Sequence, residues 1–148
     1  MIRYCWRLCT LGVFENADYA GIPEVLTKIA AEYPLYVASS KPLVFVDQIL
    51  EHFGLDGFFI RTFGSNLDGS LADKSALLRY ALAETGVSPQ RALMIGDRSH
   101  DAVGAKNNSM DFIGALYGYG CESEFEASGF ARWVTQASEL LPKITGER

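Results

Sequence analysis

Short apolar runs alternate along this chain with longer segments whose apolar residues recur every three or four positions. The short runs predict β-strands, and the longer amphipathic segments predict helices between them. Alternation of this kind is typical of an α/β fold, in which helices cover both faces of a mainly parallel sheet in three αβα layers. The expected strands are residues 35–38, 58–63, 92–95, 112–116 and 133–134, and the expected helices are 23–32, 43–53, 74–85, 99–108, 122–127 and a closing helix.

Composition narrows the class of protein further. The chain has 148 residues, 49% of them apolar, which is enough for one domain with a substantial core. Its net charge of −5 and the lack of a Lys/Arg cluster argue against nucleic-acid binding. Apolar runs are too short to span a membrane, and the start does not resemble a signal peptide. Three cysteines (Cys5, Cys9 and Cys121) without metal-site spacing suggest free thiols in a reducing, cytoplasmic environment.

The segment Gly96–Asp101 places two carboxylates, Asp97 and Asp101, where a strand ends and a helix begins. Ligands of parallel α/β proteins bind at the carboxyl ends of the strands. Paired carboxylates there are suited to Mg²⁺, which takes oxygen ligands and keeps several waters. Alternatively, Asp97 caps the helix and Asp101 only occupies its first turn.

Ser39 and Lys74 lie at two further element boundaries. The hydroxyl of Ser39, at the end of the first predicted strand, can bind a phosphate oxygen, or it can serve as a helix N-cap before Pro42. Lys74 begins a helix, where the helix dipole disfavours a cation. A functional lysine beside phosphate and carboxylates would explain this position, and a solvated surface lysine is the simpler alternative.

Four segments in this order resemble the haloacid dehalogenase-like (HAD) hydrolase superfamily, and more closely its phosphoglycolate phosphatase-like branch. They are VASSKP (37–42), FGSNLDGSLADKSALL (63–78), MIGDRSHDAVGAKNN (94–108) and LYGYG (116–120), and residues 13–26 also fit. The resemblance implies a Rossmann-like parallel sheet and Mg²⁺-dependent hydrolysis of a small phosphate ester. It implies phosphate binding by Ser39, Ser40 and Lys74, with Lys74 neutralising charge. It also implies Asp97 and Asp101 as metal-binding residues, with Asp101 as a second, catalytic acid that orients water or Lys74.

The first motif of that family, Asp-x-Asp-Gly-Thr/Ser, is absent from the sequence. In the family its first Asp attacks phosphorus to give an aspartyl phosphate, and the motif also ligates the metal. We therefore expect residues 1–19 to be a remnant of the last cap helix plus a linker, and residues 20–148 to be an incomplete HAD-like core. The opening strand and most of the helical cap are expected to be missing, and the chain alone is expected to be inactive.

The segment Asn66–Ser70 imitates the first motif, but Asn66 stands where the nucleophile would be. A neutral amide cannot form the acyl phosphate, and the segment follows the second motif rather than preceding it. We do not interpret it as a displaced active site. His100 is expected to be exposed at the surface. Arg98 either approaches the substrate or, as we expect, pairs with an outer acid.

A missing central strand would leave the strands ending at Ser39 and Asp97 without a hydrogen-bonding partner. Buried unpaired backbone groups cost roughly 1–3 kcal/mol each, which adds up to more than a typical stability margin. The expected outcomes are direct pairing of the two strands, self-association through them, or a marginally folded chain.

Three functional readings compete. The first is a HAD-like phosphatase portion that binds a small phosphate ester or inorganic phosphate, either phosphoglycolate phosphatase-like or 5'-nucleotidase-like. The second is a non-catalytic phosphate- or partner-binding pseudoenzyme. The third, a response-regulator-like or nucleotide-binding domain, does not explain Lys74 or the LYGYG segment.

Overall fold

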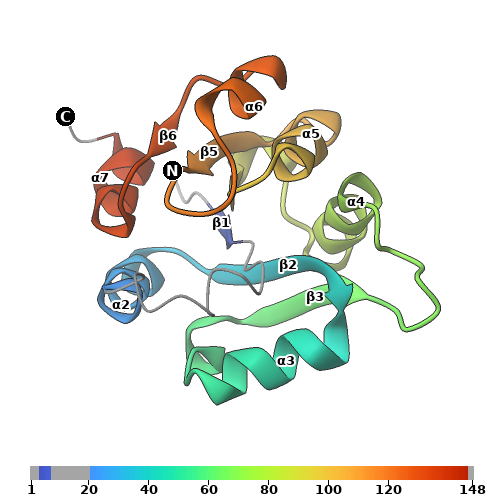
Figure 1. The fold of residues 1–148 in the computed structure, drawn as a ribbon. Coiled ribbons are helices and arrows are strands. Elements are labelled where there is room, and N and C mark those ends of the chain that lie inside the picture. Colours follow the sequence, from blue (N-terminus) through green and yellow to red (C-terminus); the bar gives the residue numbers. More distant parts are fainter. Residues whose placement is uncertain (1–3, 8–20, 147–148) are drawn as a thin grey trace.

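A computed structural model describes residues 4–7 and 21–146, and of residues 4–7 it describes the backbone. The described strands form a six-stranded sheet in the order β3-β2-β1-β4-β5-β6, and each neighbouring pair runs parallel (Figure 1). This confirms the predicted α/β class with a parallel sheet. The strands are β1 (Tyr4–Arg7), β2 (Leu35–Pro42), β3 (Arg61–Ser65), β4 (Ala92–Gly96), β5 (Asp111–Ala115) and β6 (Trp133–Val134).

The helices begin and end largely at the residues that local chemistry selects. The Asp73 carboxylate accepts a hydrogen bond from the Ala76 N–H and caps the helix that follows, which ends at Gly86 in the left-handed conformation. Both ends agree with the prediction for this helix. The described helices are α2 (Ile22–Glu32), α3 (Leu43–His52), α4 (Lys74–Thr85), α5 (Ser99–Asn107), α6 (Glu122–Ala127) and α7 (Leu140–Thr145).

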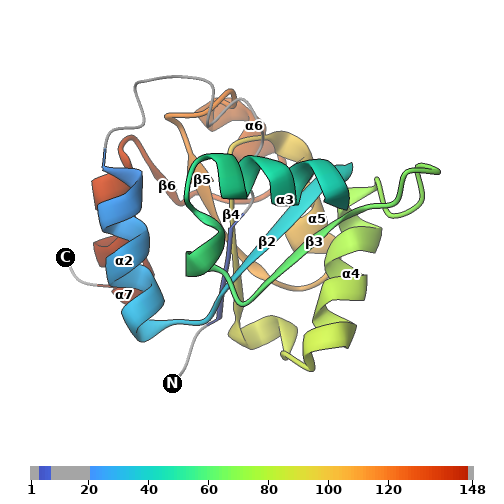
Figure 2. The same cartoon turned by 90° about the horizontal axis from the view of Figure 1, so that it is seen from below.

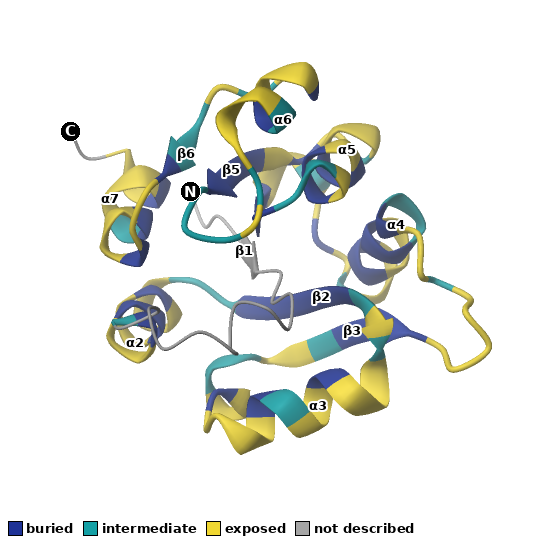
Figure 3. Cartoon of the chain, viewed as in Figure 1, coloured by how far each residue is buried: buried dark blue, intermediate teal, exposed yellow. Residues whose placement is uncertain are grey.

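Two hydrophobic clusters lie on opposite faces of the sheet, because successive strand residues point to opposite sides. Val37 and Ile95 belong to the cluster shared with α2, α3 and α7, whereas Ala38 and Met94 belong to the cluster shared with α4, α5 and α6. Figures 1 and 2 show these two helical layers around the sheet. Figure 3 shows β2 buried along most of its length, with exposed residues on the outer sides of the helices. The three-layer architecture is therefore confirmed.

The predicted gap in the centre of the sheet is wrong for this structure, because β1 lies between β2 and β4. Trp6 pairs with Tyr36 on one side and with Met94 on the other. A strand at this position gives both neighbours a hydrogen-bonding ladder, and the aromatic residues of Tyr4–Arg7 suit a strand. These four residues are therefore not helical, contrary to the expectation for a cap remnant.

Two further expectations change with this finding. Self-association was predicted on the premise that β2 and β4 lack a partner strand, and this premise does not hold because β1 pairs with each of them. The oligomeric state itself stays a prediction. The remainder of the predicted cap remnant and linker, residues 1–3 and 8–19, lies outside the described residues. The division of the chain at residue 19 likewise stays a prediction.

Two strands differ in extent from the prediction. A 3-10 turn at Asp56–Phe58 takes up the start of the predicted 58–63 strand, so that β3 begins only at Arg61. β2 continues past Ala38 to Pro42, with a shift of register against β3 between Ser39 and Pro42. This irregularity bends the chain at the expected phosphate-binding end of β2. Within the part of the chain that the structure describes, none of the helices is long and apolar enough to cross a membrane.

Candidate active site

The predicted site residues come from the carboxyl ends of β2 and β4 and from the first turns of α4 and α5. Ser39 lies in the second half of β2, Asp97 directly follows β4, and Lys74 and Asp101 lie in the two helices. All four are at most 3% exposed, which is unusual for polar side chains and requires partners inside the protein.

Lys74 connects three of these elements. Its Nζ lies 3.1 Å from Asp101 Oδ1 and donates a hydrogen bond of 2.9 Å to the Ala38 carbonyl, next to Ser39. Gly104 makes room for the lysine stem, since a Cβ there would lie 2.6 Å from Lys74 Cγ. The solvated-surface alternative for Lys74 is therefore excluded. The structure brings Lys74, Asp101 and the end of β2 together.

Asp101 uses both carboxylate oxygens within the protein. Oδ2 accepts a hydrogen bond of 3.2 Å from the Arg98 N–H, and Oδ1 faces Lys74 and also lies 3.5 Å from Nε2 of His100. The His100 side chain is about half exposed, at 50%, as expected for a surface residue. This geometry favours a role for Asp101 in holding Lys74, and its assignment as a metal ligand stays a prediction.

Asp97 is held by the loop that follows β5. Its Oδ2 accepts a hydrogen bond of 3.1 Å from the Tyr119 N–H. The backbone approaches so closely that a Cβ on Gly118 would lie 2.3 Å from Asp97 Cβ, and one on Gly120 would lie 2.0 Å from the Asp97 carbonyl oxygen. The glycines of the LYGYG segment are therefore required by contact with Asp97. Asp97 does not cap α5, whose N-cap position is Arg98.

Ser39 lies in β2, paired with Gly64 of β3, just before the register shift toward Pro42. Its Oγ accepts a hydrogen bond of 3.3 Å from the Lys41 N–H. The N-cap position of α3 is Pro42, and no side chain caps that helix, so the helix-capping alternative for Ser39 is wrong. Ser40 is half-buried and Lys41 is exposed. The assignment of Ser39 and Ser40 to phosphate binding stays a prediction.

Sequence reasoning missed Glu124, which lies in the first turn of α6. Its Oε2 accepts a hydrogen bond of 3.1 Å from the Ser99 N–H and lies 3.8 Å from Arg98 Nε. Arg98 therefore pairs with an acid outside its own loop, as expected. No sequence pattern marks Glu124, because its partner is a backbone N–H 25 residues away.

The described residues offer a limited set of metal ligands. Among them no group of three or more His, Cys, Asp or Glu side chains could enclose a metal ion. Mg²⁺ is commonly held by one or two carboxylates together with substrate phosphate and water. Asp97 supplies such an oxygen at the carboxyl end of β4, so the donor chemistry fits Mg²⁺ as a partly protein-held ion.

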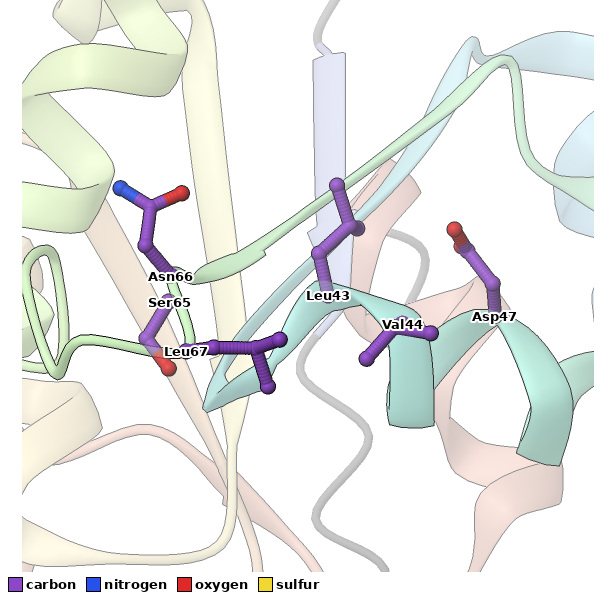
Figure 4. Close-up of a pocket in the computed structure, with 6 residues that line it drawn as sticks. All are labelled: Leu43, Val44, Asp47, Ser65, Asn66 and Leu67. Carbon is purple, nitrogen blue, oxygen red and sulfur yellow. The ribbon is translucent and has the colours of Figure 1, made fainter.

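A separate pocket of about 460 Å³ lies beside the site, between the start of α3 and the end of β3 (Figure 4). None of the four buried site residues lines it. Its lining residues are Leu43, Val44, Asp47, Ser65, Asn66 and Leu67.

The segment Asn66–Ser70, which imitates the first motif and contributes Asn66 and Leu67 to this pocket, is held by hydrogen bonds among its own residues. The pKa of Asp68 is lowered because the backbone N–H and then the hydroxyl of Ser70 donate to its carboxylate. Asn66 Nδ2 also donates to Ser70 Oγ. The segment follows β3, at one edge of the sheet, which agrees with its rejection as an active site.

Comparison with known proteins decides the family. Residues 14–115 match the sequence profile of the haloacid dehalogenase-like hydrolases. This chain belongs to that family. The predicted HAD membership is therefore confirmed, with the parallel sheet and the order of motifs that it implied.

The relatives of this HAD chain include a 5'-nucleotidase, a tyrosine-protein kinase and a phosphoglycolate phosphatase. A 5'-nucleotidase from Pseudomonas aeruginosa is 42% identical over 84% of this chain and 57% of the relative. The tyrosine-protein kinase PtkA from Mycobacterium tuberculosis is 38% identical over 84% of this chain and 43% of the kinase. A phosphoglycolate phosphatase from Colwellia psychrerythraea is 32% identical over 86% of this chain and 57% of the relative. The phosphoglycolate phosphatase-like resemblance is thus confirmed.

A solved structure supports the same assignment. A predicted phosphatase from Clostridium acetobutylicum superposes with a TM-score of 0.84 at 41% identity, covering 90% of this chain and 62% of that one. The HAD chain described here spans about half the length of the curated relatives that it matches.

Proposed function

We propose that this chain supplies the phosphate- and Mg²⁺-binding part of a HAD phosphomonoesterase and that it has no turnover by itself. The observation that carries the proposal is the position of Lys74, buried between the Ala38 carbonyl and Asp101 and adjacent to Ser39. A fixed cation beside a hydroxyl and backbone N–H groups is suited to neutralising a phosphoryl group.

Each residue has a separate task in this proposal. Ser39 and Ser40 bind phosphate oxygens, Lys74 offsets their charge, and Asp101 holds Lys74 in place. Asp97 holds Mg²⁺, which when bound adds positive charge next to the phosphate. Hydrolysis through an aspartyl phosphate also needs an attacking carboxylate, and the sequence contains no aspartate before Asp18.

The substrate class we propose is a small phosphate ester. This chain is 42% identical to the 5'-nucleotidase and 32% identical to the phosphoglycolate phosphatase. The higher identity favours a nucleoside monophosphate over phosphoglycolate as the substrate. A non-catalytic phosphate-binding protein is the alternative that shares the same binding residues. We propose a cytoplasmic location for either, because three cysteines without metal-site spacing suit free thiols in a reducing compartment.

Binding of inorganic phosphate and of Mn²⁺, as a probe for Mg²⁺, tests the proposal. We expect Asp97→Asn to weaken Mn²⁺ binding by about tenfold or more, since it removes the charged ligand. We expect Ser39→Ala to weaken phosphate binding by several-fold, since about 1 kcal/mol of hydrogen bonding is lost. Water-proton relaxation measures the first, and isothermal titration calorimetry measures the second.

Asp56→Asn is the matched control, because Asp56 is an exposed carboxylate in the 3-10 turn before β3. This variant should bind both probes as the unsubstituted chain does. If Asp97→Asn and Asp56→Asn bind Mn²⁺ equally well, Asp97 is not the cation ligand and the proposal fails.

A further inference from the structure

No side chain at the N-cap position caps helix α5, although Asp101 in its first turn accepts a hydrogen bond from the Arg98 N–H. Its N-cap position is Arg98, which has no hydrogen-bond acceptor in its side chain. The first backbone N–H groups of a helix have no intrahelical partner and are normally satisfied by a capping side chain or by water. Here the Ser99 N–H donates instead to Glu124 of α6, at 3.1 Å.

Glu124 is itself held in a fixed place by its neighbour Phe125. Phe125 is fully buried, and its ring lies 5.4 Å from the ring of Phe112. Glycines shape the slot for this ring: a Cβ on Gly114 would lie 2.3 Å from it, and one on Gly120 would lie 3.1 Å from it. The first turn of α6 is therefore anchored in the core while Glu124 points toward α5.

Ser99 lies between the two acids of the proposed site, so a contact at its backbone acts on both. On one side is Asp97, bonded to the Tyr119 N–H of the same loop that leads into α6. On the other side is Asp101, which contacts Lys74. A carboxylate at the N-terminus of α5 is also favoured by the helix dipole.

We propose that Glu124 is a positioning residue for this site. Its carboxylate fixes the Asp97–Asp101 turn through the Ser99 N–H and so sets the place of the cation-binding carboxylate. The inference rests on the proposed function, because the turn matters for cation binding only if Asp97 holds the metal. Supporting residues behind a metal ligand commonly change metal affinity by 10- to 100-fold when they are replaced.

The test uses the 148-residue chain, with amide hydrogen exchange at Ser99 and Mn²⁺ affinity as its two readouts. In Glu124→Ala we expect exchange at Ser99 to accelerate by about tenfold or more and Mn²⁺ affinity to fall by about tenfold. Glu124→Gln keeps an acceptor oxygen on a side chain of the same length. It should restore most of the exchange protection at Ser99 and most of the Mn²⁺ affinity. Glu122→Ala, an exposed acid in the same first turn, is the matched control and should change neither.

The outcomes separate this inference from the proposal on which it rests. Faster exchange at Ser99 with unchanged Mn²⁺ affinity means that Glu124 is only a structural cap, and it overturns the inference. Unchanged exchange overturns it as well. A chain that binds Mn²⁺ through Asp97 with equal affinity in the Glu124 and Glu122 variants contradicts this inference alone. An unsubstituted chain that binds no Mn²⁺ contradicts the proposed function and the inference together.

Discussion

Replacing Lys74 with methionine lowers the free energy of unfolding by about 3–5 kcal/mol, because Asp101 is then left as a buried charge without its cation. Asp101 is fully buried and Lys74 is 3% exposed, so water cannot take over as the partner. Methionine retains most of the volume beside Gly104, which limits the loss from packing. Urea denaturation of the two proteins measures the difference.

Two further variants show whether charge is the cause. Lys28→Met removes an exposed lysine on α2 and should change stability by at most about 0.5 kcal/mol. Lys74→Met combined with Asp101→Asn removes both charges and keeps an acceptor for the Arg98 N–H. It should recover about 2 kcal/mol of the loss. A Lys74→Met chain as stable as Lys28→Met would contradict the buried ion pair.

Gly120→Ala destabilises the chain by about 3 kcal/mol and weakens cation binding at the same time. Its new Cβ would lie 2.0 Å from the Asp97 carbonyl oxygen, and a contact with backbone cannot be relieved by turning a side chain. The loop or the end of β4 must therefore shift, and overpacking of this kind costs roughly 1–3 kcal/mol or more. Urea denaturation and Mn²⁺ titration measure the two effects.

Gly57→Ala is the control for this substitution, because a Cβ at Gly57 meets nothing within 4 Å. It should leave both stability and Mn²⁺ binding nearly unchanged. The contact between the LYGYG loop and Asp97 would be disproved if Gly120→Ala behaved like Gly57→Ala in both measurements.

The elements that local chemistry defines could be predicted from the sequence. Asp73 and Gly86 mark the ends of α4 because a capping carboxylate and a left-handed glycine act on their own neighbours. The approach of Lys74 to the end of β2 and to Asp101 also followed, since parallel strands end at one edge of a sheet. The functional roles assigned to these residues remain predictions.

Features that depend on distant partners could not be predicted. The Lys74 ammonium donates to the Ala38 carbonyl of β2, and every residue has such a carbonyl, so the sequence does not single out this partner. The same holds for the Tyr119 N–H at Asp97 and for Glu124 at the Ser99 N–H. β1 was missed because a strand of four residues is too short to show a period, and its place depends on two neighbours far along the chain.

Hydrolysis of p-nitrophenyl phosphate by this chain in the presence of Mg²⁺ tests the central claim most directly. We predict no hydrolysis above the uncatalysed background, with inorganic phosphate still bound, because in the proposed function this chain supplies phosphate and cation ligands but no attacking aspartate. Hydrolysis by this polypeptide that is abolished by Asp97→Ala would contradict the account.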